Sequence, residues 1–294
     1  MESTPSITVI TPSLNQAAFL ETAMLSVLGQ RYPALEYLVF DGGSTDGSAE
    51  VIRRFSGDLA FWISERDGGQ AEALNRSFAR ATGKIFCWLN SDDYLLPGTF
   101  ARVAELLGPM IDKPVVLSGG AMLFREREAE AWVRFPPPHD PARMRRKCYL
   151  TQPATFWTAA AWREVGPLDA ALHFAFDWDW FIRASERCEF IHVPELFAGY
   201  RLHAAHKSGS GGERRQTEVL EIIRRHGSAE TSAHYEWLLA HPPHWPAIRR
   251  WRDARALCER RGFPASLAAL AAPQLLNLSA PLDRETLADC LESL

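Results

Sequence analysis

The chain has 294 residues, of which 47% are apolar and 23% are charged, and its formal net charge is −4. These values are ordinary for a folded globular protein and exclude a disordered or fibrous chain. A net negative charge provides no bulk basic field for nucleic acid, and no apolar run reaches the about 18–20 residues that span a bilayer.

Short apolar runs alternate with amphipathic stretches along the first half of the chain. The β-branched and aromatic runs predict strands at 7–10, 37–40, 61–63, 85–89 and near 115–117. The stretches between them predict helices at about 15–28, with Asn15 as its N-cap, at 48–55, at 70–81 and after Pro97. This rhythm predicts an α/β fold with a Rossmann-like, doubly wound, mostly parallel sheet.

The second half of the chain has a less regular pattern. It predicts a strand at 152–157 and a helix from Asp177 to about Arg187. The Gly-Ser-Gly-Gly run at 209–212 predicts a hinge, and the residues after it are expected to be helical. We therefore expect one domain at 1–209, with halves at about 1–118 and 119–209, and a C-terminal helical region at 210–294.

Polar and acidic residues follow the predicted strands, at the edge where open parallel sheets bind ligands. Asp92 and Asp93 come directly after a buried strand, where two adjacent carboxylates are unfavourable unless a cation neutralises them. Mg²⁺ or Mn²⁺ would suit these oxygen ligands. An Asx turn or a helix cap is the alternative interpretation of this pair.

Two glycine-rich segments follow neighbouring strands. Asp41 opens the segment 41–47, whose glycines allow a ligand to approach the backbone closely, although their spacing is not that of a dinucleotide fingerprint. We expect Asp41 to accept hydrogen bonds from a base or ribose and Asp46 to cap a helix. Asp67 opens the second segment, which Asn75 follows, and either a ligand site or a simple turn fits it.

Two more carboxylates, Asp177 and Asp179, lie among aromatic residues. Desolvation in such surroundings raises a carboxyl pKa, which suits a general base. Because the two residues are two apart on a helix, their side chains point about 200° from each other and cannot both face one ligand. We assign catalysis to Asp177 and a structural role in the first helical turn to Asp179.

The segment 200–208 combines Arg, His and Lys side chains beside glycines. We interpret it as a flexible stretch that closes over a diphosphate. A solvated linker is the alternative interpretation.

Together these segments resemble glycosyltransferase family 2, whose members have the GT-A fold. The resemblance covers roughly residues 6–208, and it is carried by ITPSLNQAAFL, VFDGGSTDGS, WISERDGGQAEALN, CWLNSDDYLLPGTF, QPATFW, FDWDWFIR and YRLH, in the family's order. The last residues, about 85, take no part in it. The halves at about 1–118 and 119–209 would then be the nucleotide-binding and acceptor halves of a GT-A catalytic domain.

The resemblance implies a metal-dependent, inverting glycosyltransferase with Mn²⁺ or Mg²⁺ as cofactor. Such an enzyme moves a sugar from a nucleotide diphosphate sugar, with a UDP-sugar favoured, to a hydroxyl of a glycan, lipid-linked or other acceptor. Bacterial polysaccharide biosynthesis is the expected setting. Nucleic acid is not an expected partner.

The resemblance also implies roles for individual residues. Asp177 would be the catalytic base, and Asp93 and His203 would hold the metal. The nucleotide sugar would be bound by Pro12, Ser13, Asn15, Asp41, Asp67, Gln70, Asn75 and Asp92. The family often has Glu-Asp where this chain has Phe176-Asp177, so the resemblance leaves the binding of the acceptor hydroxyl open.

Two other functions fit parts of the pattern. A catalytically inert module that binds carbohydrate or a sugar nucleotide would share the fold, but the retained Asp93 and Asp177 argue against it. A nucleotidyltransferase would need basic residues near the first loop, and residues 3–30 contain neither Lys nor Arg.

The C-terminal region and the cysteines bear on where the protein acts. The arginine-rich segment 246–261 has helical periodicity and either packs on the catalytic domain or rests on a membrane surface. The N-terminus lacks the features of a signal peptide, and the five widely spaced cysteines favour reduced thiols. We expect a cytoplasmic protein. Peripheral contact with the inner face of the membrane is the alternative to a protein that is free in the cytoplasm.

Overall fold

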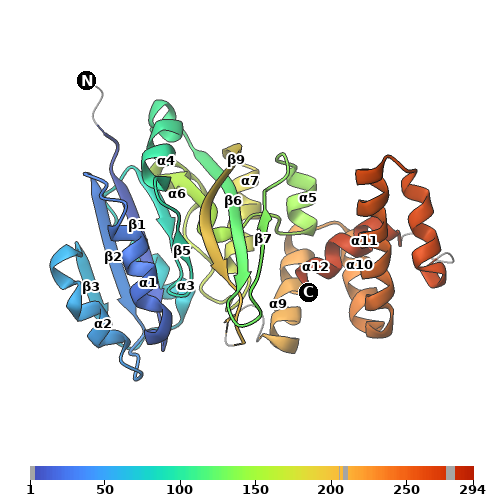
Figure 1. Ribbon diagram of the computed structural model, residues 1–294, viewed down its shortest axis with the longest axis horizontal. Helices are drawn as coiled ribbons and strands as arrows, with labels where there is room; N and C mark the ends of the chain where they lie inside the picture. Colours follow the sequence, from blue (N-terminus) through green and yellow to red (C-terminus); the bar gives the residue numbers. More distant parts are fainter. Residues whose placement is uncertain (1–3, 205, 208–210, 276–281) are drawn as a thin grey trace. The chain divides into compact units, whose positions relative to one another are not determined.

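The computed structural model describes residues 4–204, 206–207, 211–275 and 282–294 (Figure 1). The chain divides into two compact units. The first unit comprises 1–139 and 149–210, and the second comprises 140–148 and 211–294. Residues 140–148, which the sequence assigns to the first domain, therefore group with the C-terminal helices.

The first unit is built on a mixed sheet with nine strands among the described residues, in the order β3-β2-β1-β4-β8-β6-β9-β5, with β7 paired to β6. Strands β1 to β4 run parallel, whereas β8 is antiparallel to both of its neighbours. Figure 1 shows β1, β2 and β3 side by side, and β6 between β7 and β9. The strands are β1 Ile7–Ser13, β2 Leu35–Asp41, β3 Phe61–Ser64, β4 Ile85–Trp88, β5 Tyr94–Leu95, β6 Val115–Arg125, β7 Glu130–Arg134, β8 Thr155–Thr158 and β9 Glu189–Arg201.

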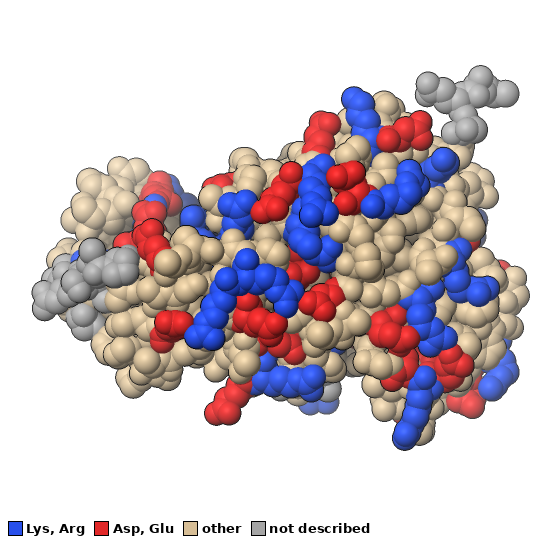
Figure 2. Space-filling model, turned by 180° about the vertical axis from the view of Figure 1, so that it is seen from behind, with Lys and Arg blue, Asp and Glu red and all other residues tan. Residues whose placement is uncertain are grey.

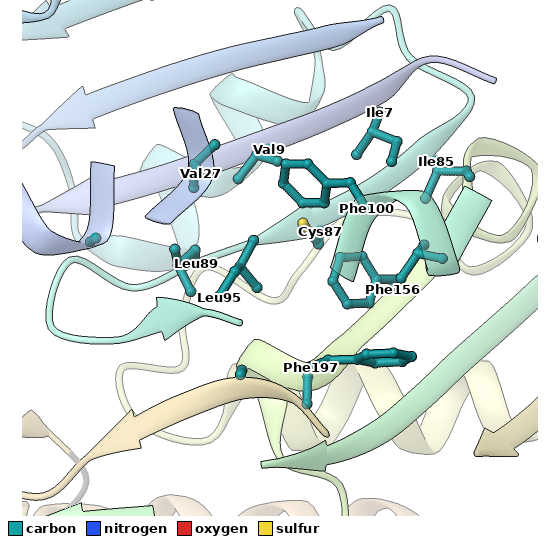
Figure 3. Close-up of a cluster of buried hydrophobic side chains, with 14 of the residues drawn as sticks. Ile7, Val9, Val27, Ile85, Cys87, Leu89, Leu95, Phe100, Phe156 and Phe197 are labelled. Carbon is teal, nitrogen blue, oxygen red and sulfur yellow. The ribbon is translucent and has the colours of Figure 1, made fainter. Parts of the chain in front are cut away.

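Helices cover both faces of this sheet. Helices α1 (Ala17–Leu28), α2 (Ser48–Arg54) and α4 (Thr99–Leu107) pack on one face, and Figure 3 shows part of their shared core with Val9, Cys87 and Phe100. Helices α3 (Gln70–Phe78), α6 (Ala159–Val165) and α7 (Phe176–Ser185) belong to the other face. There the Trp157 ring lies 5.7 Å from Phe78 and 4.9 Å from Trp180. The described residues of the first unit also form three short 3₁₀ helices, η1 Ser56–Asp58, η2 Gly108–Met110 and η3 Gln152–Ala154.

The predicted doubly wound α/β architecture is confirmed, and so are the strands and helices predicted for the first half. The expected N-cap of the first helix is wrong. Gln16 occupies that position, while Asn15 has a positive φ of 52°. The Asn15 side-chain oxygen instead accepts a hydrogen bond of 2.9 Å from the backbone N–H of Thr45. Asn15 therefore joins the loops that follow β1 and β2.

The long strand β9 is absent from the sequence prediction, and Tyr200 and Arg201, predicted to lie in a flexible stretch, form its end. Pro194 and Gly199 disfavour a strand locally. Pairing with β6 along nearly its whole length overrides this preference. Gly199 also fits its neighbour, because a Cβ there would meet the Tyr94 ring at 2.2 Å.

The second unit is helical throughout its described residues, as predicted for the C-terminal region. Its core is formed by residues such as Ile222, Tyr235, Ile248 and Leu287, which are all fully buried. Its helices are α5 Pro141–Arg146, α9 Gly212–His226, α10 Ala229–Ala240, η4 Pro242–His244, α11 Trp245–Arg261, η5 Ala265–Ala271, η6 Pro273–Leu275 and α12 Arg284–Ser293. None of the helices in the described part of the chain has the length and hydropathy needed to cross a bilayer.

Charged side chains of both signs are intermingled on the face drawn in Figure 2. The composition agrees with this view, because 32 basic residues are balanced by 36 acidic ones. This face therefore lacks the continuous basic field that non-specific binding of nucleic acid requires.

Candidate functional site

A cavity of about 360 Å³ lies in the first unit, next to the loops that follow β1, β3 and β4. Both halves of that unit contribute to it. Of the residues predicted for the site, seven line the cavity: Pro12, Ser13, Asp67, Gln70, Asp92, Asp93 and Asp177. The structure thus brings together carboxylates that are far apart in the sequence.

The Asp92–Asp93 pair lies at one wall of this cavity. The Asp93 carboxylate is 2% exposed and accepts hydrogen bonds from the backbone N–H of Arg201 at 3.0 Å and from Nδ2 of Asn90 at 3.4 Å. Burial, together with the neighbouring charge of Asp92, raises the pKa of Asp93 well above its ordinary value. The pair is therefore a place where a bound cation would be stabilised.

Arg201 supports this pair from β9. Its Nε donates a 2.9 Å hydrogen bond to the backbone oxygen of Asp92, and its guanidinium group pairs with Glu126. The guanidinium carbon lies 4.8 Å from the ring centre of Phe19 and 4.9 Å from that of Phe124. Arg201 is 6% exposed, so it is a fixed part of the cavity wall rather than part of a mobile loop.

His203 reaches the pair through Asp92. Its Nε2 lies 3.1 Å from Oδ2 of Asp92, although His203 does not itself line the cavity. The ring of His203 lies 4.6 Å from that of Phe19. Across the described ranges, no group of three or more His, Cys, Asp or Glu side chains is close enough together to hold a metal.

A row of hydrogen-bonded polar side chains lines the cavity, and the sequence does not predict this arrangement. The ammonium of Lys207 donates to Oε1 of Gln70 at 2.9 Å, and Nε2 of Gln70 donates to Oδ1 of Asn90 at 2.8 Å. Nδ2 of Asn90 donates to Oε1 of Gln152 at 3.2 Å. Nε2 of Gln152 then donates to the backbone oxygen of Trp88 at 2.7 Å, which fixes the orientation of every amide in the row.

The structure separates the two carboxylates of α7. Asp177 lines the cavity in the first helical turn, where its Oδ1 accepts a 2.7 Å hydrogen bond from the backbone N–H of Trp178. Asp179 is 2% exposed, lies outside the cavity lining and forms a 2.9 Å ion pair with Arg183. Because Arg183 also donates to two backbone oxygens, of Val165 and Pro167, the Asp179 pair fastens α7 to the end of α6.

An aromatic wall adjoins Asp177. His173, Phe174 and Phe176 line the cavity, and the Lys207 ammonium lies 5.2 Å from the ring centre of Phe176. Phe176 stands where glycosyltransferase family 2 often has a glutamate. This part of the cavity wall is therefore apolar instead of carrying a carboxylate. Gln152 and Phe176 begin two of the stretches that carry the resemblance, QPATFW and FDWDWFIR, but the sequence assigned neither a role in the site. The fold brings both to the same cavity.

Three residues predicted to bind the donor do not line the cavity, namely Asn15, Asp41 and Asn75. Asp41 is 2% exposed and accepts hydrogen bonds from Ser44 and Ser64, including one of 2.6 Å from Oγ of Ser64. Asp41 thus holds the loop after β2 in place through these hydrogen bonds and does not itself line the cavity.

The amide of Asn75 bonds to the main chain of Leu168 in both directions, at 2.9 Å each. This arrangement makes Asn75 a brace between α3 and the segment before α7. Asp46 was expected to cap a helix, but Gly47 is the N-cap of α2. The Asp46 carboxylate instead accepts hydrogen bonds from the backbone N–H groups of Ala17 and Ser48, the first residues of α1 and α2.

Ser13 is a further point of interest on the cavity wall. It is 5% exposed at the end of β1, and its Oγ makes no hydrogen bond with any described residue. A buried hydroxyl without a partner is unfavourable. A ligand that fills the cavity would provide one.

Comparison of the sequence with known proteins identifies one family. The family model described as "Glycosyl transferase family 2" matches residues 8–165. An uncharacterized glycosyltransferase of Mycobacterium tuberculosis is 29% identical over 230 residues, which cover 77% of this chain and 85% of the relative. A PGL/p-HBAD biosynthesis glycosyltransferase of Mycobacterium bovis is 30% identical over 183 residues, covering 61% of this chain and 69% of the relative.

Solved structures show the same fold at low sequence identity. The mannosyltransferase PcManGT from Pyrobaculum calidifontis, in complex with GDP-Man and Mn²⁺, has a TM-score of 0.57 and 22% identity, covering 99% of this chain and 85% of that one. S. aureus TarS 1–349, in complex with UDP-GlcNAc, has a TM-score of 0.57 and 17% identity, covering 80% of this chain and 71% of that one. The expected GT-A fold is therefore confirmed.

Proposed function

The chain belongs to glycosyltransferase family 2, and from this premise we propose that it transfers a sugar from a UDP-sugar to a hydroxyl of an acceptor, with inversion at the anomeric carbon. One observation carries the proposal: a single cavity is lined both by the Asp92–Asp93 pair and by Asp177. A transferase of this kind needs a site for the diphosphate and a base for the acceptor within reach of one sugar.

The donor set fits a divalent cation. Asp93 is buried, its two hydrogen bonds come from uncharged N–H donors, and its pKa is raised by burial and by Asp92. We propose that Asp92 and Asp93 hold Mn²⁺ or Mg²⁺, with His203 next to Asp92. When bound, the cation supplies charge stabilisation for the diphosphate leaving group.

The residues of the chain would carry the remaining steps. Asp177 accepts the proton of the acceptor hydroxyl. As it does so, the oxygen of that hydroxyl forms a bond to the anomeric carbon, and the bond from that carbon to the diphosphate breaks. Base catalysis of this kind contributes about 10²–10⁴-fold. Lys207 and His206 line the same cavity, and the ammonium of Lys207 adds positive charge where the leaving group gains negative charge.

The donor assignment rests on resemblance and on the neighbours. TarS is described in complex with UDP-GlcNAc and PcManGT with GDP-Man, so two proteins of this fold bind nucleotide diphosphate sugars. We favour a UDP-sugar as donor and a glycan or a lipid-linked hydroxyl as acceptor.

A panel of nucleotide sugars, each with and without Mn²⁺, tests the proposal. UDP-sugars should raise the temperature of thermal unfolding more than purine nucleotide sugars, and NMR of the product should show inverted anomeric configuration. Binding of a UDP-sugar without transfer of its sugar to any acceptor or to water would indicate an inert binding module instead. Equal stabilisation by GDP- or dTDP-sugars would contradict the uridine assignment.

A further inference from the structure

The cavity leaves the arginine-rich helix of the second unit without a role. Helix α11 packs mainly against η4, η5, η6 and α12, which all belong to the same unit. Its inner face is formed by Ala247, Ile248 and Trp251, which are 2%, 0% and 7% exposed. The opposite face of α11 is exposed.

That exposed face gathers cations. At 100° per residue, Arg249, Arg250, Arg260 and Arg261 fall within an arc of about 120° that is centred opposite Ile248 and Trp251. All four are exposed. The acid within this arc, Asp253, is already bound to Arg252 at 2.8 Å.

The arginines of α11 fall into two classes. Arg252 pairs with Asp253 and Glu292, and Arg255 pairs with Glu259 and Glu285. By contrast, the four arginines of the outer face make no ion pair and no side-chain hydrogen bond with any described residue. Four positive charges on one helix face are thus uncompensated within the described chain.

Large apolar side chains are exposed on α11 itself and in the segment that follows it and packs against it. Leu257, within the same arc of α11, is 50% exposed. Phe263, Leu267 and Leu270, in the turn after α11 and in η5, are 60%, 46% and 79% exposed. Cations combined with exposed apolar groups are typical of surfaces that lie at a lipid–water boundary.

We propose that these four arginines and four apolar residues, here called the α11–η5 surface, dock on an anionic lipid bilayer. The arginines meet lipid phosphates, and the apolar side chains enter the boundary of the acyl chains. A nucleic acid would use the charges but leave the leucines without a favourable environment. The inference does not depend on the proposed transferase activity.

Co-sedimentation of the full chain with lipid vesicles tests this surface. At low ionic strength the protein should bind vesicles of phosphatidylcholine and phosphatidylglycerol but not vesicles of phosphatidylcholine alone, and salt should weaken the binding. Each arginine near an anionic surface contributes about fivefold to the partition coefficient. Replacing all four with Gln should therefore lower that coefficient by at least about a hundredfold.

A control variant separates this surface from net charge. Replacing Arg31, Arg127, Arg134 and Arg163 with Gln removes the same number of exposed charges from the first unit. This control should keep nearly all vesicle binding. Since every changed residue is exposed, circular dichroism and thermal unfolding should be unaltered in both variants.

A second variant tests the apolar part. Phe263→Ser with Leu270→Ser should lower the partition coefficient about tenfold while all charges remain. The proposal would be overturned if the wild type did not bind anionic vesicles, or if the arginine variant and its control lost vesicle binding equally. It would also be overturned if the apolar variant bound vesicles as the wild type does and the wild type bound single-stranded DNA as tightly as vesicles.

Discussion

The β1–β4 half and the β6–β9 half of the first unit supply the candidate site in different ways. In the β1–β4 half, strands β1, β3 and β4 lead directly into loops at the cavity, so Pro12, Asp67 and Asp93 lie a few residues beyond a predicted strand. In the β6–β9 half, antiparallel and crossover pairing brings in Gln152 and Arg201 from elements without such a rule. Site residues that closely follow a predicted strand can therefore be identified from the sequence. Residues such as Gln152 and Arg201 cannot, because long-range strand pairing brings them to the cavity.

The largest effect should come from Asp177, the proposed base, which the β6–β9 half contributes. We expect Asp177→Asn to lower the transfer rate by about 10²-fold or more, because the acceptor hydroxyl loses its proton acceptor. Donor affinity, measured by calorimetry, should not change. The matched control is Asp179→Asn, which should lower thermal stability through loss of the Arg183 pair and leave the transfer rate per folded molecule near normal.

This assignment would be reversed by one pattern of results. An active Asp177→Asn enzyme, with a well-folded but inactive Asp179→Asn enzyme, would make Asp179 the base.

The next effect tests whether Arg201 of β9 supports the acidic pair of the β1–β4 half. Arg201→Met removes the donor to the backbone oxygen of Asp92, and loss of such supporting contacts lowers metal affinity about 10–100-fold. We expect that loss in a titration with Mn²⁺ in the presence of UDP. Arg102→Met, which breaks a surface pair with Glu195, is the matched control and should bind Mn²⁺ normally.

Asp41 tests how a buried carboxylate of the β1–β4 half serves the donor site. Asp41→Ala leaves Ser44 and Ser64 without their acceptor, which costs about 1–3 kcal/mol in the free energy of unfolding and loosens the loop after β2. UDP binding should weaken several-fold by calorimetry. Asp46→Ala, which removes hydrogen bonds to the starts of α1 and α2 away from the cavity, should lower stability and leave UDP affinity intact; equal UDP affinities of the two variants would contradict this role.

Much of the fold was predictable because the first half has strong periodicity. Strand β9 was not, since Pro194 and Gly199 hide a strand that forms only by pairing with β6. Asp93 and Asp177, which were predicted from residue type and resemblance, both line the cavity. Gln152 also lines it but was not predicted, because a single glutamine acquires its place only from hydrogen bonds between distant segments. Asn75 was expected at the donor, yet its position in α3 directs it to Leu168.

The smallest functional effect should come from Asn75. We expect Asn75→Ala to lower the free energy of unfolding by about 1–2 kcal/mol, because two hydrogen bonds to Leu168 are lost. Affinity for UDP should remain within error of the wild type. A large loss of UDP affinity with normal stability would return Asn75 to the donor site.

Calorimetric titration with UDP tests most directly whether the Asp92–Asp93 pair binds a divalent cation together with the nucleotide diphosphate. We expect Mn²⁺ to strengthen UDP binding to the wild type relative to binding in chelator, and Asp93→Asn to abolish this gain while the protein stays folded. Identical UDP affinity in Mn²⁺ and in chelator for the wild type, or an undiminished gain in Asp93→Asn, would contradict this role of the pair.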